Sequence, residues 1–368
     1  MNTLQQLTQH GQAVWFDYIR RSFLDSGELQ RLVDAGVRGV TSNPSIFEKA
    51  IAGSADYDAE LAQLVAAGLT ADEIYEALAL EDIRRACAVL RPVYDASQGE
   101  DGYVSIEVSP TLAHDTARTI AEARRLFTTL DLPNVMIKVP ATPAGVPAVA
   151  TLISAGINVN VTLIFSLAQY EAVAAAYLAG LEVRHAASGD LGRVASVASF
   201  FVSRVDTAVD PLLADLGETE LAGKIANDNA KVAYARFQQL FAGERWAPLA
   251  AAGARVQRPL WASTGTKNPA YPDTLYVDGL IGPHTVNTLP PATLEAFRDH
   301  GTVAATLTAD VATSHARLAR LAELGIDLGT ITQKLQDDGV ASFAQAFEGL
   351  MASVTQRRSE LLARKGGA

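Results

Sequence analysis

Lys138 has the most distinctive chemical context of any residue in this sequence. It lies in the run NVMIKVPAT over residues 134–142. A short apolar run that ends at proline and small residues is typical of a buried strand in a parallel sheet. Lysine is rarely buried unless it is paired or functional. Burial disfavours the charged ammonium, and the neutral amine is a nucleophile toward carbonyl carbons. Lys138 therefore predicts Schiff-base chemistry.

The chain uses lysine sparingly. Of its 30 basic residues, seven are lysine and 23 are arginine. Arginine stays protonated and cannot form an imine. The alternative for Lys138 is structural: its alkyl stem would pack while its ammonium reached water at the strand end. Its position in the sequence leaves both interpretations open, so the other strands must decide between them.

Polar residues also lie inside or directly after the other apolar runs. In (β/α)₈ enzymes the active site is built from the C-terminal ends of the strands. The candidate carboxylates are Asp17 and Glu107. The candidate amides and hydroxyls are Asn43, Asn160, Thr162 and Ser199. A third group contains the cations Arg204 and Lys267 together with the hydroxyl of Ser263. Packing alone explains so many polar groups poorly, because each unpaired buried one costs about 1–3 kcal/mol.

These residue types fit one reaction. A lysine forms an imine with a ketone, and two carboxylates can move the protons that imine formation and carbon–carbon cleavage require. Asn and Ser side chains suit the hydroxyls of a sugar. Arg204 and Lys267, with Ser263, could supply the local positive charge that a phosphate needs.

Each candidate also has a structural interpretation. A lone Asp in a strand can be a hydrogen-bonded core group. Arg204 and Asp206 can be a surface ion pair, Lys267 can be solvated, and the pair at 43–44 can be a helix start. His114 and His284 make no recognisable metal-ligand spacing with an acid, so we predict no metal site.

Short strand-like runs alternate with longer helical patterns, which is typical of βα units around a parallel sheet. The predicted strands are Val14–Tyr18, Gly39–Ser42, Tyr103–Val108, Val135–Pro140, Val159–Phe165, Val194–Phe201, Pro259–Ser263 and Leu275–Val277. About eight strands close a (β/α)₈ TIM barrel, so we predict an α/β fold of this kind with additional C-terminal helices.

The helices expected between the strands include Asp72–Asp95, Asp115–Leu130, Ser166–Ala179 and Glu218–Phe241. Ser166 with a Gln three residues later predicts a capping box. Helices at Ala292–His300, Ala309–Leu324 and Leu328–Arg364 should pack over the barrel or its end. No linker or repeat divides the chain, so residues 1–368 are expected to form one domain, with the extra helices in about 290–368.

Composition excludes some functions. The formal net charge is −11, which argues against a nucleic-acid partner or an anionic membrane surface. The single cysteine, Cys87, cannot form an internal disulfide and is expected to be buried in a helix. No signal segment and no long apolar run occur, so we expect a cytoplasmic protein.

Five runs of the sequence resemble the transaldolases, the Schiff-base transferases of the pentose phosphate pathway. They are GVTSNPSIF at 39–47, VSIEV at 104–108, VMIKVPAT at 135–142, GINVNVTLIFS at 156–166 and SFFVSR at 199–204. The whole chain is similar to the longer bacterial form of the family.

The resemblance implies a role for each matching residue. Lys138 corresponds to the Schiff-base lysine and Asp17 to the acid that takes the C4 hydroxyl proton. Glu107 corresponds to the acid–base residue that acts through a water, and Thr162 to the group that holds this water. The residues that would hold the dihydroxyacetone part are Asn43, Asn160 and Ser199, and Arg204 would bind phosphate.

The sequence departs from the family at one loop. Many transaldolases have Ser-x-Arg where this chain has STGTK at 263–267. Ser263 and Lys267 are therefore the phosphate ligands expected there, with lysine acting as a point charge. The related fructose-6-phosphate aldolases carry Gln and Tyr where this chain has Glu107 and Phe201. Phe cannot donate a proton to the enamine, so Phe201 favours transfer over release.

We therefore predict a transaldolase that moves a dihydroxyacetone unit between sugar phosphates, without a metal or organic cofactor. The expected donors are sedoheptulose 7-phosphate and fructose 6-phosphate, and the acceptors glyceraldehyde 3-phosphate and erythrose 4-phosphate. A monomer or homodimer is expected. The alternatives are a lyase related to fructose-6-phosphate or deoxyribose-phosphate aldolases, and an inactive barrel that senses sugar phosphates.

Overall fold

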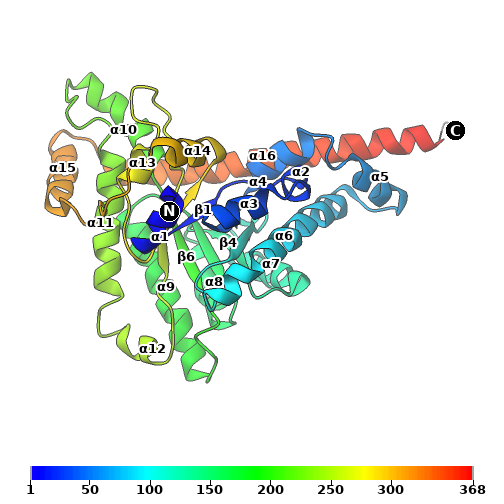
Figure 1. Ribbon diagram of the computed structural model, residues 1–368, viewed down its shortest axis with the longest axis horizontal. Coiled ribbons are helices and arrows are strands. Elements are labelled where there is room, and N and C mark those ends of the chain that lie inside the picture. The colour runs from blue at the N-terminus through cyan, green and yellow to red at the C-terminus, as the bar shows by residue number, and fades with distance from the viewer. Residues whose placement is uncertain (1, 367–368) are drawn as a thin grey trace.

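A closed barrel of eight parallel strands forms the centre of the computed structural model, which describes residues 2–366 (Figure 1). The strands pair in chain order and are β1 (Gln12–Phe16), β2 (Val37–Thr41), β3 (Tyr103–Glu107), β4 (Val135–Pro140), β5 (Val159–Ile164), β6 (Ser196–Phe201), β7 (Arg258–Ala262) and β8 (Thr285–Leu289). The predicted (β/α)₈ fold with C-terminal helices is confirmed. Residues 1 and 367–368 of the predicted domain lie outside the described residues.

The predicted eighth strand was wrong. Residues 275–277 belong to the one-turn helix α13 (Leu275–Asp278), and β8 follows it and closes the barrel against β1. Three apolar residues are too few to distinguish a strand from a helical turn. The true strand, TVNTL, contains a fully buried Asn287, and this polar interior position hid it from a search for apolar runs.

Two of the four helices predicted between strands match the structure to within one residue at each end, α6 (Ala71–Ala96) and α7 (Thr116–Leu130). The third, α9 (Leu167–Ala186), begins as predicted, with Ser166 capping it in the predicted box, but ends seven residues later than Ala179. The fourth, α11 (Ile225–Leu240), begins seven residues later than predicted, after a turn in which Gly223 has a φ of +70°. That conformation favours glycine and does not continue a helix. Cys87 is buried in α6, as expected.

The remaining helices before the C-terminal region include α8 (Gly145–Ser154) between β4 and β5, α10 (Ser203–Asp215) between β6 and β7, and several shorter segments. The shorter segments are α1 (Thr3–Gln9), α2 (Arg21–Asp25), α3 (Glu28–Ala35), α4 (Pro44–Phe47), the π-helix η1 (Glu48–Ala52), α5 (Asp58–Ala66), the 3₁₀-helix η2 (Pro110–Leu112) and α12 (Ala247–Ala251). None of the helices that the structure describes combines the length and hydrophobicity needed to cross a bilayer.

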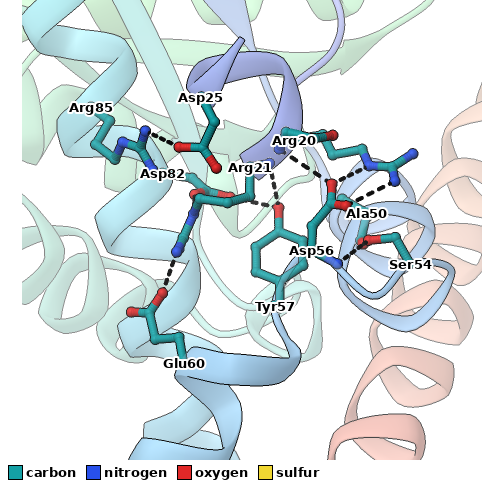
Figure 2. A network of polar contacts seen from close by, with 11 residues as sticks. Arg20, Arg21, Asp25, Ala50, Ser54, Asp56, Tyr57, Glu60, Asp82 and Arg85 are labelled. Carbon is teal, nitrogen blue, oxygen red and sulfur yellow. Dashed lines mark hydrogen bonds and ion pairs between the residues drawn. The ribbon is translucent and has the colours of Figure 1, made fainter.

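A buried polar network holds the chain where it leaves β1 (Figure 2). Arg21 Nε donates to Asp82 Oδ1 of α6 at 2.5 Å, and Tyr57 Oη donates to Asp82 Oδ2 at 2.7 Å. The backbone N–H of Arg21 donates to Tyr57 Oη at 3.0 Å. Arg20 pairs with Asp56 at 2.6 Å. These contacts tie the start of α2 to α5 and α6, only a few residues after Asp17.

Three helices follow the barrel: α14 (Pro291–His300), α15 (Val311–Glu323) and α16 (Leu328–Gly366). The long α16 crosses the C-terminal end of the barrel and continues to the far tip of the molecule (Figure 1). Gln336 of α16 donates to the carbonyls of Ala141 and Leu163 at 3.0 and 2.9 Å. Further along, Arg357 and Arg358 donate to backbone carbonyls near η1 and α5. The C-terminal helix therefore covers the barrel mouth.

Candidate active site

Lys138 lies in the middle of β4, and its register sets its neighbours. Parallel pairing places Glu107 of β3 on one side of it and Asn160 of β5 on the other. The Lys138 side chain is 6% exposed. Its Nζ donates to the carbonyl of Ser42 at 3.0 Å and lies 3.3 Å from Glu107 Oε2. The predicted burial of Lys138 is therefore confirmed. The structural alternative, in which its ammonium extends into water at the strand end, is excluded.

Glu107 ends β3 with a side chain that is 5% exposed. Burial raises the pKa of its carboxyl, and the positive charge of Lys138 opposes that rise. Two buried oxygens here have no hydrogen-bond partner among the described residues, Glu107 Oε2 and Thr162 Oγ1. Buried polar atoms of this kind are normally satisfied, often by water. The site therefore offers two acceptors for a water near the amine.

Asp17 follows β1 directly, and its backbone N–H donates to Leu289 of β8 at 2.9 Å. Thr41 Oγ1 lies 2.6 Å from Asp17 Oδ1 and 2.7 Å from Thr288 Oγ1. Burial raises the pKa of Asp17, while Lys138 and the Thr41 hydrogen bond lower it. The Asp17 carboxyl is thus fixed in position by Thr41 and binds a proton more tightly than a solvated aspartate does.

A cavity of about 160 Å³ opens at this end of the barrel. Nine of the eleven predicted site residues line it: Asp17, Asn43, Lys138, Thr162, Ser199, Phe201, Arg204, Ser263 and Lys267. The other two, Glu107 and Asn160, stand directly behind its wall, in contact with Lys138 and Ser199. We call this space the substrate cavity.

Amides and hydroxyls occupy one side of the substrate cavity. Asn160 Oδ1 accepts from Ser199 Oγ at 2.6 Å, and its Nδ2 donates to Ser105 Oγ at 3.1 Å. Asn43 caps α4, where its Oδ1 accepts from the N–H of Ile46 at 3.0 Å. The helix-start interpretation of Asn43 is therefore right for its carbonyl oxygen, while its Nδ2 group stays available to a ligand.

Cationic groups occupy another part of the wall. Arg204 begins α10 and lies over the Phe201 ring at 5.5 Å. Burial lowers its pKa, and the charge of Asp338 on α16 opposes this. No described carboxylate pairs with its guanidinium; Asp206 accepts instead from Ala226 N and Tyr276 Oη. The surface-pair alternative for Arg204 is thus excluded.

The loop after β7 completes this part of the site. Ser263 has a φ of +54°, and its Oγ lies 3.1 Å from Ser203 Oγ at the start of α10. Lys267 is exposed but borders the same cavity. Both residues therefore lie where an anion held by Arg204 could reach them.

Some lining residues escaped the sequence analysis: Thr41, Ala262, Gly265, Thr288, Pro290 and Phe343. Thr41 lies inside a quoted run and could have been found as the hydroxyl before Asn43. Thr288 was missed together with β8. Phe343 comes from α16, and its ring centroid lies 5.8 Å from Lys138 Nζ. No local pattern distinguishes it from the other apolar residues of that helix.

Comparison with known proteins agrees with this geometry. The family model described as Transaldolase/Fructose-6-phosphate aldolase matches residues 14–354. The chain belongs to this family. The match covers β1 from Val14, the other seven strands completely and most of α16, so the family resemblance noted in the sequence is confirmed.

Individual relatives are similar over almost their whole length. Transaldolase 1 of Streptomyces coelicolor is 51% identical over 358 residues, which is 96% of this chain and 94% of that protein. Transaldolase of Neisseria meningitidis is 50% identical over 352 residues, 96% of this chain and 99% of that protein. Transaldolase 2 of Nostoc punctiforme is 47% identical over 371 residues, 97% of each.

Proposed function

We propose that this chain is a transaldolase that carries a dihydroxyacetone unit as a Schiff base on Lys138. The observation that carries this proposal is the buried amine between Glu107 and the substrate cavity, with Asp17 in the same wall. Relatives that are named transaldolase and are 50–51% identical in sequence support the same activity. The substrates proposed are sedoheptulose 7-phosphate or fructose 6-phosphate as donor and an aldose phosphate as acceptor.

The first step forms the imine. The Lys138 amine attacks the C2 ketone of the donor and gives a carbinolamine. Protonated Glu107, acting directly or through a water held with Thr162, gives its proton to the carbinolamine hydroxyl. The C2–O bond breaks, water leaves, and the nitrogen lone pair forms the C=N bond. The raised pKa of Glu107 favours the protonated form that this step requires.

The second step breaks the carbon chain. Asp17 takes the proton of the C4 hydroxyl, the C3–C4 bond breaks, and its electron pair moves to the protonated imine to give an enamine. The aldose phosphate leaves with C4 as its aldehyde carbon. Attack of the enamine on the acceptor aldehyde reverses these steps. No metal or organic cofactor is required, because the protonated imine accepts the electrons.

The remaining residues bind substrate in this proposal. Asn43, Asn160 and Ser199 would hold the hydroxyls of the dihydroxyacetone part. The phosphate would lie against Arg204, with Ser263 and Lys267 completing its site. The guanidinium of Arg204 is half-buried and forms no ion pair with a described carboxylate. This supports the assignment, because a buried charge needs a counter-charge.

A lyase is the second candidate function, since the matching family includes fructose-6-phosphate aldolases. Phe201 favours transfer. Its ring packs against Phe165 at 5.1 Å and against Arg204, and it has no proton to give to the enamine. Steady release of free dihydroxyacetone without an acceptor would favour the lyase instead.

Reductive trapping tests the proposal. Borohydride is added in the presence of fructose 6-phosphate, and the modified residue is located by peptide mass spectrometry. We expect one adduct, on Lys138, and none in Lys138→Arg. A coupled transaldolase assay should show activity that Lys138→Ala abolishes. Full activity in Lys138→Ala, or an adduct elsewhere, would overturn the mechanism, and inactivity of the unaltered chain would favour the sensor alternative.

We also propose that the enzyme acts in the pentose phosphate pathway, in the cytoplasm, as a monomer or homodimer. The net charge of −11 disfavours binding to nucleic acid, so we propose no nucleic-acid partner. Light scattering of the purified chain would decide the oligomeric state.

A further inference from the structure

A second cavity, of about 320 Å³, lies beside the substrate cavity. It is bounded by α6 and α7 on one side and by the end of β3 on the other. Its lining includes the exposed Asp72 and Thr111 as well as the buried Ile106 and the Glu107 side chain, which is 5% exposed. The cavity therefore reaches from the protein surface to the catalytic carboxyl.

Glu107 stands in the wall that divides the two cavities. It lines the second cavity but not the substrate cavity, whereas Lys138 lines the substrate cavity but not the second one. The two side chains nevertheless lie 3.3 Å apart. One side of the Glu107 carboxyl thus faces the amine, and the other faces a space that opens to solvent.

Helix α16 covers both spaces from one face. Phe343 lines the substrate cavity, and Phe347, one turn later, lines the second cavity and packs on Tyr75 with ring centroids 5.4 Å apart. Ion pairs hold the outer side of the second cavity, since Arg125 of α7 lies 2.6 Å from Glu76 of α6 and 2.9 Å from Glu122. The Arg125–Glu76 pair links the two helices, and Glu122 holds the Arg125 side chain from within α7.

The proposed reaction requires water to move at Glu107. Dehydration of the carbinolamine releases one water, and hydrolysis of the product imine consumes one. During both steps a sugar phosphate occupies the substrate cavity and closes the barrel mouth. A space that opens to the surface and carries polar groups in its wall can hold water, unlike a closed void lined only by apolar groups. Ser42, Asn43, Ser109 and Glu107 supply polar groups along the second cavity.

We propose that the cavity between α6 and α7 is a solvent channel, through which water exchanges with Glu107 while substrate fills the barrel mouth. This inference rests on the proposed Schiff-base function. It gives Glu107 a route to bulk water that is separate from the route of the sugars.

The test follows the C2 oxygen of the donor. Fructose 6-phosphate labelled with ¹⁸O at C2 is incubated in ordinary water with Asp17→Asn, which should form the imine but not break the C3–C4 bond, so that the whole sugar stays in the substrate cavity. The reaction is quenched before uncatalysed ketone exchange, and the label in the recovered fructose 6-phosphate is read by mass spectrometry. We expect Asp17→Asn to return the sugar without the label, because the released water leaves through the channel before the imine is hydrolysed.

Two variants narrow the channel and one serves as a matched control. Ala79 and Leu126 are buried and line the second cavity, so Ala79→Phe and Leu126→Phe place an aromatic ring in it. Ala77 lies on the same helix but does not line the cavity, so Ala77→Phe is the control. The thermal unfolding midpoint of each variant checks its fold, and Leu126→Phe serves if Ala79→Phe does not fold.

Introduced into Asp17→Asn, either narrowing substitution should keep severalfold more label in the recovered sugar than Asp17→Asn alone or with the control substitution. Equal label loss in all of them would overturn the channel, and so would retention with the control substitution. Full retention by Asp17→Asn alone with a borohydride adduct on Lys138 would also overturn it. Full retention without an adduct in the unaltered enzyme would overturn the Schiff-base function itself, so the two failures are distinguishable.

Discussion

The Nζ atom of Lys138 lies 3.3 Å from Glu107 Oε2, and parallel pairing of β3 with β4 sets the two residues directly side by side. The contact is almost completely buried, so solvent screens it little. Burial raises the pKa of Glu107, and the charge of Lys138 works against that rise. The Glu107 carboxyl therefore lies within reach of the amine and holds a proton more tightly than a solvated glutamate does, which suits it to act as the acid in imine formation.

Glu107→Gln should slow imine formation while leaving the donor affinity nearly unchanged. The amide keeps the size of the side chain but cannot give a proton, and general acid–base groups contribute about 10²–10⁴-fold to a rate. Borohydride trapping measured against time, at saturating fructose 6-phosphate, reports this step. Asp72→Asn provides a control, because Asp72 is an exposed acid of the second cavity. Trapping at the unaltered rate in Glu107→Gln would contradict the assignment.

The two catalytic carboxyls should give opposite pH dependences. The pKa of Glu107 and that of Asp17 are both raised by burial. Glu107 acts when protonated, so the rate of trapping should fall as pH rises through its pKa. Asp17 acts when ionised, so the rate of carbon–carbon cleavage should fall as pH drops through its pKa. Rapid-quench measurement of each step against pH checks this, and Glu107→Gln should remove only the first dependence.

The network behind β1 should matter for stability. Asp82 is fully buried and accepts from Arg21 and Tyr57. Asp82→Ala would remove the buried partner of Arg21, which keeps only its ion pair with the partly exposed Glu60. Loss of one member of a buried pair destabilises by about 3–5 kcal/mol, and the remaining Glu60 pair places the expected effect near the lower end of that range. We expect a clear drop in the urea midpoint. Asp95→Ala, which removes an exposed pair with Arg91 on the same helix, should change it by less than about 1 kcal/mol. Equal effects would refute the argument.

The fold was largely predictable because seven strands are apolar runs followed by Pro, Gly or polar residues. The eighth strand was missed, since its buried Thr285, Asn287 and Thr288 interrupt the apolar run by which the other strands were recognised. Strand ends identified the residues around Lys138, because the topology of a parallel barrel gathers those ends in one place. The sequence could not show that Phe343 reaches the same site, since the path of α16 depends on long-range contacts such as those of Gln336.

Stability should also depend on pH through Asp206. Burial raises its pKa to about 7, while Asp210 and Asp228 add to the rise and the bonds from Ala226 N and Tyr276 Oη oppose it. The folded state therefore holds this proton more tightly than the unfolded state. The protonated carboxyl stabilises the folded state fully at pH values below the range in which a solvated aspartate ionises. This stabilisation is lost as the pH rises through about 7.

Asp206→Asn removes this titration. Relative to the unaltered enzyme, the variant should gain stability between acid and neutral pH, by at most about 4 kcal/mol. Urea unfolding at a series of pH values measures the difference. Asp215→Asn on the same helix is exposed and should show no such trend. A constant difference between Asp206→Asn and the unaltered enzyme across that range would contradict the raised pKa.

Phe201 should decide between transfer and release. Its ring lines the substrate cavity beside Lys138 and carries no proton donor. Phe201→Tyr adds a hydroxyl that can help to protonate the enamine, so free dihydroxyacetone should form faster from fructose 6-phosphate without an acceptor, and transfer should fall relative to release. Phe343→Tyr adds the same group from α16 and tests whether position matters. If Phe201→Tyr released no more dihydroxyacetone than the unaltered enzyme, enamine lifetime would have to be set by exclusion of water from the cavity and not by the lack of a proton donor at this residue.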